Sequence, residues 1–175
     1  ETCGDCLLQY YDFTGKIYYT LASIEDNLEE YNDAEINYKI AYDNFKFNYN
    51  SNTRYLIDVL NSLGLLMVHK EKYSQALSYY TECIQLCKEH GDIYSQLTYL
   101  YLNLGRLYQL KGNYQNSEKV FKEAIKIEES KTKKDQLTIA MLYGSLGQLY
   151  DLDGDHHRSI NFLLYSLSLF ESFEN

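Results

Sequence analysis

The densest group of side chains that could do chemistry lies near the end of the sequence, at residues 151–157. This segment reads Asp-Leu-Asp-Gly-Asp-His-His and puts three carboxylates and two imidazoles within one turn, which are ligand types that cations take. A calcium-binding loop places its glycine later and has an acid at its twelfth position, where this chain has Phe162. We therefore expect no metal site and interpret Asp155 as the cap of a helix.

Four cysteines raise the question of redox chemistry. Cys3 and Cys6 form a C-x-x-C pair that could be redox-active, but no strand follows it, so two free thiols at a frayed terminus are the favoured alternative. Cys83 and Cys87 share one face of a helix and are predicted to be small core residues. No asparagine begins an N-x-S/T sequon, which favours a reducing, cytoplasmic location.

Charge and motifs exclude several classes of protein. The net charge is −9, and residues 1–50 alone hold 10 acids and 3 bases, so binding to phosphate backbones is disfavoured. The acidic stretch from Glu25 to Glu35 could dock a basic partner, although a solvated helix surface is the favoured alternative. No apolar run approaches the roughly 20 residues that span a bilayer, so membrane insertion is not expected. No nucleophile, phosphate-loop or H-E-x-x-H motif occurs, so we expect neither an enzyme nor a cofactor.

Glycines at a near-fixed interval indicate the elements that position these residues. Gly64, Gly105 and Gly147 each follow a leucine and recur at a period of about 42 residues, which indicates a stack of similar supersecondary units. Gly15 is a fainter upstream copy. Apolar residues at helical spacing, broken by tight turns, predict two helices per unit and an all-α chain. The expected units cover about residues 5–50, 53–90, 92–131 and 134–173.

The residues around the glycines carry a resemblance. An aromatic, Leu-Gly, Tyr, a small residue and a second aromatic recur, and the third unit gives Tyr101, Leu104-Gly105, Tyr108, Ser117 and Phe121. This pattern resembles the tetratricopeptide repeat (TPR), and the long period is similar to the branch seen in kinesin light chains and Pins-type scaffolds. In the first unit, Ala34 and Tyr38 take the later positions after about seven extra residues, which should add two turns to that hairpin.

The resemblance implies a right-handed superhelix of antiparallel hairpins, a single array over residues 1–175 that forms part of a longer chain or assembly. It also implies a non-enzymatic scaffold that binds a peptide segment of a partner protein in a concave groove. Asn103 matches the asparagine that holds a peptide backbone in this family, and a solvated helix residue is the equally open alternative. The groove positions carried over from the family are Asp12, Lys16, Tyr19, Asn61, Ser62, Leu65, His69, Tyr99, Asn103, Arg106, Gln109, Ser145, Gln148 and Asp151.

The last helix suggests an alternative function. It is apolar on more than the stripe that one hairpin can cover, and terminal repeats normally carry a polar outer face. A structural building block of a larger assembly, packed through its ends and convex face, is therefore the second hypothesis. The side chains expected to contact another chain or a following repeat are Leu164, Leu167, Phe170 and Phe173.

Overall fold

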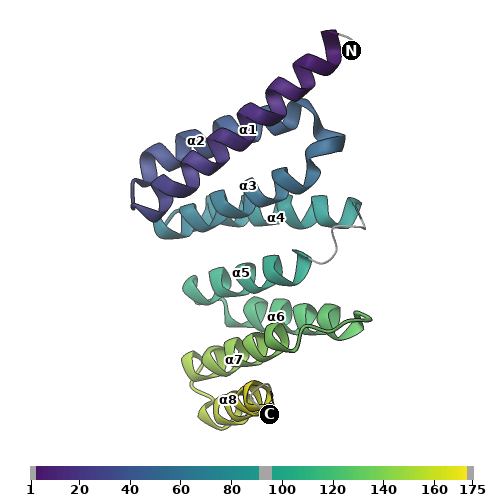
Figure 1. Ribbon diagram of the computed structural model, residues 1–175. Coiled ribbons are helices and arrows are strands. Elements are labelled where there is room, and N and C mark those ends of the chain that lie inside the picture. Colours follow the sequence, from purple (N-terminus) through teal and green to yellow (C-terminus); the bar gives the residue numbers. More distant parts are fainter. Residues whose placement is uncertain (1–2, 91–95, 173–175) are drawn as a thin grey trace. The chain divides into compact units, whose positions relative to one another are not determined.

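The computed structural model describes residues 3–90 and 96–172, and all regular structure within these ranges is helical (Figure 1). Consecutive helices pair into four hairpins, which confirms the expected all-α fold of about four repeats. The helices are α1 (Cys3–Asn27), α2 (Tyr31–Phe47), α3 (Tyr49–His69), α4 (Tyr73–Glu89), α5 (Leu97–Leu110), α6 (Tyr114–Ser130), α7 (Gln136–Leu152) and α8 (His156–Glu171).

The chain divides into two compact units. Unit 1 spans Glu1–Ile93 and holds α1 to α4, and unit 2 spans Tyr94–Asn175 and holds α5 to α8. Within each unit the second helix of one hairpin packs on the first helix of the next, α2 on α3 and α6 on α7. The right-handed superhelix of one continuous array stays a prediction. The expected start of the third repeat, at 92, lies outside the described residues.

Each hairpin turn contains one residue in the left-handed region, namely Glu29 (φ 63°), Glu71 (φ 57°), Gly112 (φ 68°) and Gly154 (φ 84°). In every turn the next residue donates its backbone N–H to the carbonyl five residues back, at 2.8–2.9 Å. This is the hydrogen bond of a Schellman motif, which stops the first helix and lets the chain reverse. Two turns use glycine, which adopts this conformation without strain, and two use glutamate, which does not.

The repeat glycines mark the places where the two helices of a hairpin come closest. A Cβ atom on Gly105 would lie 2.3 Å from Cε1 of Phe121, and one on Gly64 would lie 2.5 Å from Cε1 of Tyr80. Both rings are fully buried, so they lie on the bare glycine backbone. Ser117, at the small position of the third repeat, donates its hydroxyl to the carbonyl of Gly105 at 2.8 Å. The equivalent pairs in the outer hairpins are Gly15 with Phe45 and Gly147 with Leu163.

The first hairpin differs from the expected register. Its glycine, Gly15, meets Phe45, which lies nearly twice as far along the chain from its glycine as the partner does in the other hairpins. The small residue one turn before that ring is Ala41, so the assignment of Ala34 and Tyr38 to these positions is wrong. Both pairs fit the same spacing because they lie two helical turns apart on one helix face, and all four side chains are buried. The insertion therefore adds two turns to each helix of the hairpin rather than two in all.

An ion-pair cluster joins the first two hairpins. Glu35 of α2 accepts hydrogen bonds from Lys39 at 2.6 Å and from Lys70 at 2.7 Å, and Lys70 also donates to Asn32 at 2.8 Å. Burial of Glu35 opposes its ionisation, but the two lysines outweigh that effect and lower the pKa of Glu35 to about 2. The carboxylate therefore stays charged at neutral pH and fixes the end of α3 against α2.

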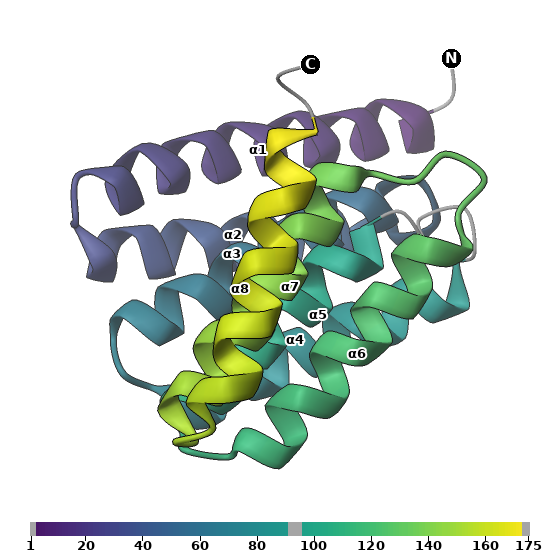
Figure 2. The ribbon, with the colours of Figure 1, turned by 90° about the horizontal axis from the view of Figure 1, so that it is seen from below.

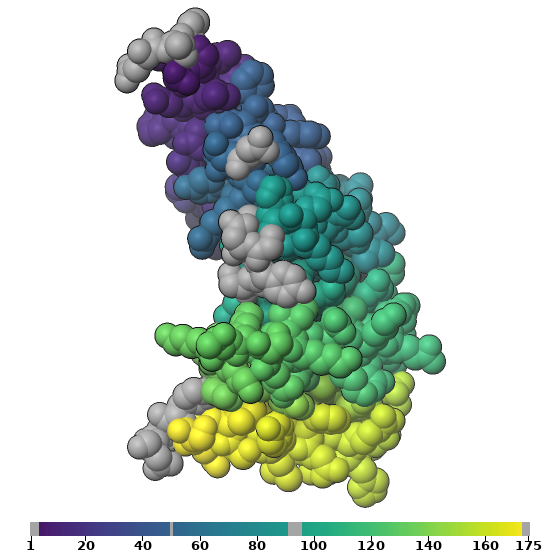
Figure 3. All heavy atoms as spheres, turned by 90° about the vertical axis from the view of Figure 1, so that its right-hand side faces the viewer, coloured from purple at the N-terminus to yellow at the C-terminus, as the bar shows by residue number. Residues whose placement is uncertain are grey.

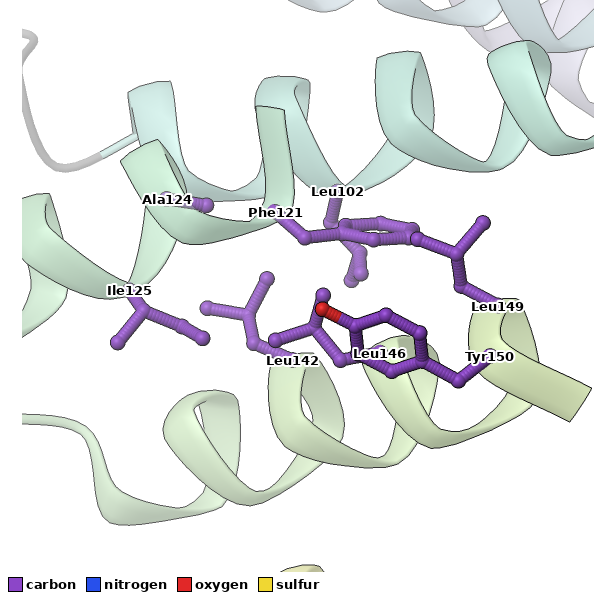
Figure 4. Close-up of a cluster of buried hydrophobic side chains, with 8 residues drawn as sticks. All are labelled: Leu102, Phe121, Ala124, Ile125, Leu142, Leu146, Leu149 and Tyr150. Carbon is purple, nitrogen blue, oxygen red and sulfur yellow. The ribbon is translucent and has the colours of Figure 1, made fainter. Parts of the chain in front are cut away.

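Leucines and aromatic rings hold the two hairpins of unit 2 together. Figure 4 shows Phe121 and Ala124 of α6 facing Leu142, Leu146 and Tyr150 of α7, all of them buried. The ring of Tyr150 lies in this apolar cluster, and its hydroxyl is hydrogen-bonded because it donates to the carboxylate of Glu118 at 2.7 Å. Area removed from water stabilises such a contact by about 25 cal/mol per Å². The interface between α6 and α7 is thus an ordinary hydrophobic core, and it holds the first helices of unit 2 in place.

Candidate functional site

The expected groove residues fall on two faces, one in each unit, because α1 lies beside α3 and α5 lies beside α7. The α1–α3 face holds Asp12, Lys16, Tyr19, Asn61, Ser62, Leu65 and His69. The α5–α7 face holds Tyr99, Asn103, Arg106, Gln109, Ser145, Gln148 and Asp151.

Contacts between neighbouring helices order the α1–α3 face. The ammonium group of Lys16 donates to Oδ2 of Asp12 at 2.7 Å and lies 4.8 Å from the ring centroid of Tyr55. The hydrogen bond with Asp12 is the largest cause of a raised pKa at Lys16, so the lysine is charged throughout the physiological range. The hydroxyl groups of Tyr19 and Ser62 meet at 3.5 Å across the two helices. This part of the face is therefore polar, and its one ion pair, between Lys16 and Asp12, is partly exposed.

The other expected members of the α1–α3 face lie apart from that cluster. His69 is exposed and its ring stacks on the ring of Tyr31, with centroids 5.6 Å apart, near the hairpin turn. Leu65 is exposed by 38%, and Asn61 is half-buried. The structure thus brings Lys16 and Asp12 together but leaves His69 engaged with α2.

A cavity of about 240 Å³ opens between α1 and the first turns of α3. Its lining residues are Leu8, Gln9, Asp12, Lys16, Asn48, Ser51, Asn52 and Tyr55. Asn52 is only 2% exposed, and within the described ranges neither its side-chain nitrogen nor Oδ1 of Asp12 has a hydrogen-bond partner, although both atoms are buried. Sequence reasoning missed Asn52 because it started the second repeat at 53, whereas α3 begins at Tyr49.

The α5–α7 face presents a tyrosine that is already engaged. The hydroxyl of Tyr99 donates to Oδ2 of Asp135 at 3.3 Å and lies 3.0 Å from the hydroxyl oxygen of Thr138, which donates its own hydrogen to the same carboxylate oxygen at 2.7 Å. Asp135 also caps α7, since its side chain accepts from the backbone N–H of Thr138 at 3.2 Å. The hydrogen bond from the Thr138 side chain is the main cause of a lowered pKa at Asp135. Tyr99 is still 48% exposed, so its ring remains open to a partner.

Other residues of the α5–α7 face differ in their availability. Ser145 is buried and donates its hydroxyl to the carbonyl of Met141 at 2.9 Å, so it offers little to a partner. Gln109 reaches the backbone of Ser145 at 3.4 Å. Arg106 and Gln148 are exposed, while Asn103 is half-buried. The accessible polar chemistry of this face therefore lies at Arg106 and Gln148.

The acidic segment near residue 155 forms a helix start, as predicted. Asp155 caps α8 by accepting from the backbone N–H of Arg158 at 2.9 Å, and its other oxygen accepts from Nε of Arg158 at 2.6 Å. Asp151, the last expected groove residue, is exposed and lies 3.0 Å from Nδ1 of His156. Across the part of the chain that the structure describes, no group of three or more histidines, cysteines or acids could hold a metal ion.

The two cysteines of α4 are core residues, which confirms the prediction. Cys83 and Cys87 are fully buried, and the thiol of Cys83 donates to the carbonyl of Ile57 at 3.2 Å. Burial raises the pKa of Cys87 to about 11 and the pKa of Cys83 further. Both thiols are therefore protonated and unreactive at neutral pH. Cys6 is exposed on α1.

The outer face of α8 leaves large apolar side chains in water. Leu164 is 58% exposed, Leu167 is 51% exposed and Phe170 is 38% exposed, and Phe173 lies outside the described residues. The inner face packs on α7, where Ser166 donates to the carbonyl of Ala140 at 2.7 Å. Figure 2 shows α8 overlying α7, with which it pairs, and in Figure 3 the yellow atoms near the end of the chain border green atoms on one side.

A second apolar stripe, which sequence reasoning missed, runs along the outer face of α1 and ends in the turn that follows it. Its members recur every three or four residues from Leu7 to Leu28, and each is at least 41% exposed. They are Leu7, Tyr10, Phe13, Ile17, Leu21, Ile24 and Leu28. The same helical spacing that indicates a core face in a sequence here belongs to a surface. Among the described helices, none is both long and apolar enough to cross a membrane.

Comparisons of the fold identify several similar structures. BtubC (BKLC) from P. vanneervenii has a TM-score of 0.84 at 19% identity, with 94% of this chain and 66% of that chain covered. Aspartyl phosphate phosphatase F from Bacillus subtilis has a TM-score of 0.79 at 13% identity, with 92% of this chain and 41% of that chain covered. The Rap conjugation gene regulator of the plasmid pLS20, in complex with the Phr* peptide, has a TM-score of 0.73 at 14% identity, with coverages of 94% and 44%. The chain thus spans less than two thirds of each of these structures, and the likeness is one of fold.

Sequence comparisons agree with the fold. No curated protein matches the chain. Residues 96–172 match the family described as tetratricopeptide repeat, which confirms the expected resemblance for unit 2. Residues 1–101 match the family described as anaphase-promoting complex subunit 5. Because that match covers more than half of the chain, and because the paired helices repeat throughout, the chain belongs to the anaphase-promoting complex subunit 5 family and is a tetratricopeptide repeat protein.

Proposed function

We propose that this chain is a non-enzymatic scaffold that holds a peptide segment of a partner protein against the first helices of its hairpins, within a larger assembly. The observation that carries the proposal is the α5–α7 face, where the half-exposed ring of Tyr99 lies on the same face as the exposed side chains of Arg106 and Gln148. Tyrosine and arginine are the residue types most often responsible for binding energy at protein interfaces.

The rigidity of the helices supports this proposal. Each first helix is fixed by a bare glycine pressed on a side chain of its partner helix, as at Gly105 and the buried ring of Phe121. A face on rigid elements binds with little loss of conformational entropy. One structure of similar fold contains a bound peptide, which lends the proposal support from the fold alone. The name of the matched family points to a multi-subunit complex, and we take the partner to be another subunit of such a complex.

The absence of catalytic activity is also part of the proposal, since one structure of similar fold is a phosphatase by description. Asp135, the carboxylate next to Tyr99, serves as a helix cap and is bonded to Thr138 and Tyr99. Its lowered pKa makes it a poor general base or acid at neutral pH. The surface chemistry of the face therefore fits recognition better than catalysis.

Site-specific photocrosslinking tests the scaffold. A benzophenone amino acid is placed at Gln148 in one protein and at Lys126 of α6 in a matched control, since both positions are exposed. We expect crosslinks to one partner from Gln148 and none from Lys126. The peptide identified in this way should bind about tenfold more weakly when Arg106→Ala and Gln148→Ala are combined, with an unchanged melting temperature. Equal crosslinking from both positions, or unchanged affinity, would count against the groove.

A structural building block is the second candidate, and the exposed side chains on α8 favour it. Each large apolar side chain left in water forgoes roughly 1.5–3 kcal/mol of burial, so Leu164, Leu167 and Phe170 together favour a contact. In sedimentation experiments, Leu164→Glu with Leu167→Glu should abolish association and leave helicity intact. Asn161→Glu, on an exposed polar part of the same helix, serves as the control. A wild-type chain that stays monomeric at high concentration argues against this candidate.

A further inference from the structure

The exposed apolar stripe on α1 occupies positions that are buried in other first helices. Counted from the repeat glycine, the residues eight and five places before it and two places after it are apolar in α1, α3 and α7. They are Leu7, Tyr10 and Ile17 in α1, Leu56, Val59 and Leu66 in α3, and Ile139, Leu142 and Leu149 in α7. In α3 and α7 each is at most 4% exposed, whereas in α1 each is at least 47% exposed. The α1 stripe therefore has the composition of a face that packs on another helix.

In α3 and α7, this face is covered by the second helix of the preceding hairpin. α2 packs on α3, and α6 packs on α7. In Figure 4, Ile125 of α6 points toward Leu142 of α7. The ring of Phe121, also on α6, points toward Leu149 in the same buried cluster. The α1 stripe therefore matches the outer face of a second helix of this kind.

The outer face of α8 is such a surface. Residues of α6 that contact α7 or its N-cap lie at Phe121, three places before it, and four and seven places after it. The equivalent residues of α8 are counted from Leu163, which is pressed on Gly147 as Phe121 is on Gly105. They are Ile160, Leu163, Leu167 and Phe170. All four are apolar and at least 38% exposed, so α1 and α8 expose the two complementary halves of the interface that α7 and α6 form.

We propose that α8 of one copy of this chain packs on α1 of a second copy, as α6 packs on α7, so that copies associate head to tail. The proposal rests on the building-block function above and names its partner. The register of the α6–α7 interface places Leu167 of one copy against Tyr10 of the next. The same register places Leu163 against Ile17.

Charge favours this pairing over a symmetric one through α1. The helix α1 holds four acids and one lysine, so two α1 helices face to face would repel each other. The helix α8 holds one glutamate and one arginine, so it brings no net charge against α1 when its histidines are neutral. An α8–α1 contact therefore buries apolar surface from both helices with less repulsion than an α1–α1 contact.

Mixing two blocked variants tests the pairing, with sedimentation of the whole chain as the readout. The α1-blocked chain carries Tyr10→Glu and Ile17→Glu, and the α8-blocked chain carries Ile160→Glu and Leu167→Glu, all at exposed positions. Each variant alone should be monomeric, with association weakened about 100-fold or more, because burying an unpaired carboxylate is strongly disfavoured. An equimolar mixture should form a dimer and nothing larger, since each variant keeps one of the two faces.

The wild type should associate increasingly with concentration, because it keeps both faces. The net charge of −9 makes copies repel one another, so the measurements use about 0.5 M salt to screen it. The matched control combines Asn27→Glu and Asn161→Glu, which add the same charge at exposed positions of α1 and α8 outside the proposed contact. This control should associate as the wild type does, and circular dichroism should show the same helix content in every variant.

Other results would overturn the proposal. A wild type that stays monomeric at about 1 mM would show that the two faces do not bind each other. Self-association of the α8-blocked chain would mean that α1 pairs with α1, and self-association of the α1-blocked chain would mean that α8 pairs with α8. Either result would leave a building block with a different interface. The peptide-scaffold proposal is tested separately, because crosslinking from Gln148 uses neither α1 nor α8.

Discussion

The contact between Gly105 and Phe121 leaves no room for one added methyl group, and this can be tested by Gly105→Ala. The new Cβ would lie 2.3 Å from Cε1 and 2.6 Å from Cδ1 of Phe121. The ring is fully buried and packs against Leu146 of α7, so it cannot turn away into solvent. Forcing atoms into a packed core costs about 1–3 kcal/mol, and alanine returns up to about 1 kcal/mol of helix propensity. The net loss of stability should be about 1–2 kcal/mol.

Thermal and urea unfolding, followed by circular dichroism, measure this loss. For a chain of 175 residues we expect the melting temperature to fall by about 2–8 °C. Gly144→Ala is the matched control, because its Cβ would meet only the side chain of Ser166, at 3.2 Å. Gly147→Ala should also destabilise the chain, since its Cβ would lie 2.6 Å from Cγ of Leu163 and 3.2 Å from the backbone nitrogen of that residue, which no change of rotamer moves.

A double-mutant cycle gives the result that would refute the reasoning. If the clash is with the ring, Phe121→Leu should cost less in the Gly105→Ala background than in the wild type, because leucine relieves the contact. Additive losses would mean that the alanine acts elsewhere. A Gly105→Ala protein as stable as the wild type would show that the glycine is not required by packing at all.

Three further changes test a turn, an ion pair and the thiols. Glu71 has φ of 57°, so Glu71→Gly should raise the urea midpoint by the equivalent of about 1 kcal/mol, and a lower midpoint would contradict the strain. The pKa of Glu35 is lowered from 4.5 to about 2, so its contribution is complete above the unfolded value and is lost as the pH falls towards 2. After allowance for solvent screening, Glu35→Gln should cost about 1–2 kcal/mol at pH 7 and much less near pH 2 in thermal melts, where about half of the Glu35 carboxyl groups are protonated in the folded protein, whereas an equal cost at both pH values would exclude the ion pair as the cause. N-ethylmaleimide should modify Cys6 in the folded protein but Cys83 and Cys87 only in urea, as followed by mass spectrometry, and their labelling in the native state would disprove their burial.

The packing within each repeat could be predicted because the residues that contact one another are close together in the sequence. Gly105 and Phe121 are close in the sequence, with one hairpin turn between them, and a single tight turn fixes which faces meet. Asp155 was predictable as a cap for the same reason, since its partner Arg158 lies three residues away. Local spacing also placed Cys83 and Cys87 in the core.

The first hairpin shows where local spacing fails. Ala34 with Tyr38 and Ala41 with Phe45 repeat the same pattern two turns apart, so either pair could face Gly15. Only the lengths of the two helices choose between them, and helix ends are weakly encoded. The start of α3 was misplaced for the same reason, and with it Asn52 and the cavity beside it.

The chemistry of the two faces depends on side chains about one repeat apart. Tyr19 of α1 meets Ser62 of α3, and Tyr99 of α5 meets Asp135, the cap of α7. These pairs cross between neighbouring hairpins, so no pattern within one repeat reports whether a polar side chain is engaged or available. Ser62 and Ser145 hold similar groove positions, yet one meets a tyrosine across the face while the other is buried on its own helix. A repeat motif therefore predicts which face of a first helix is turned toward its neighbours, whereas the polar side chains that stay available on that face depend on the residues that the next hairpin supplies.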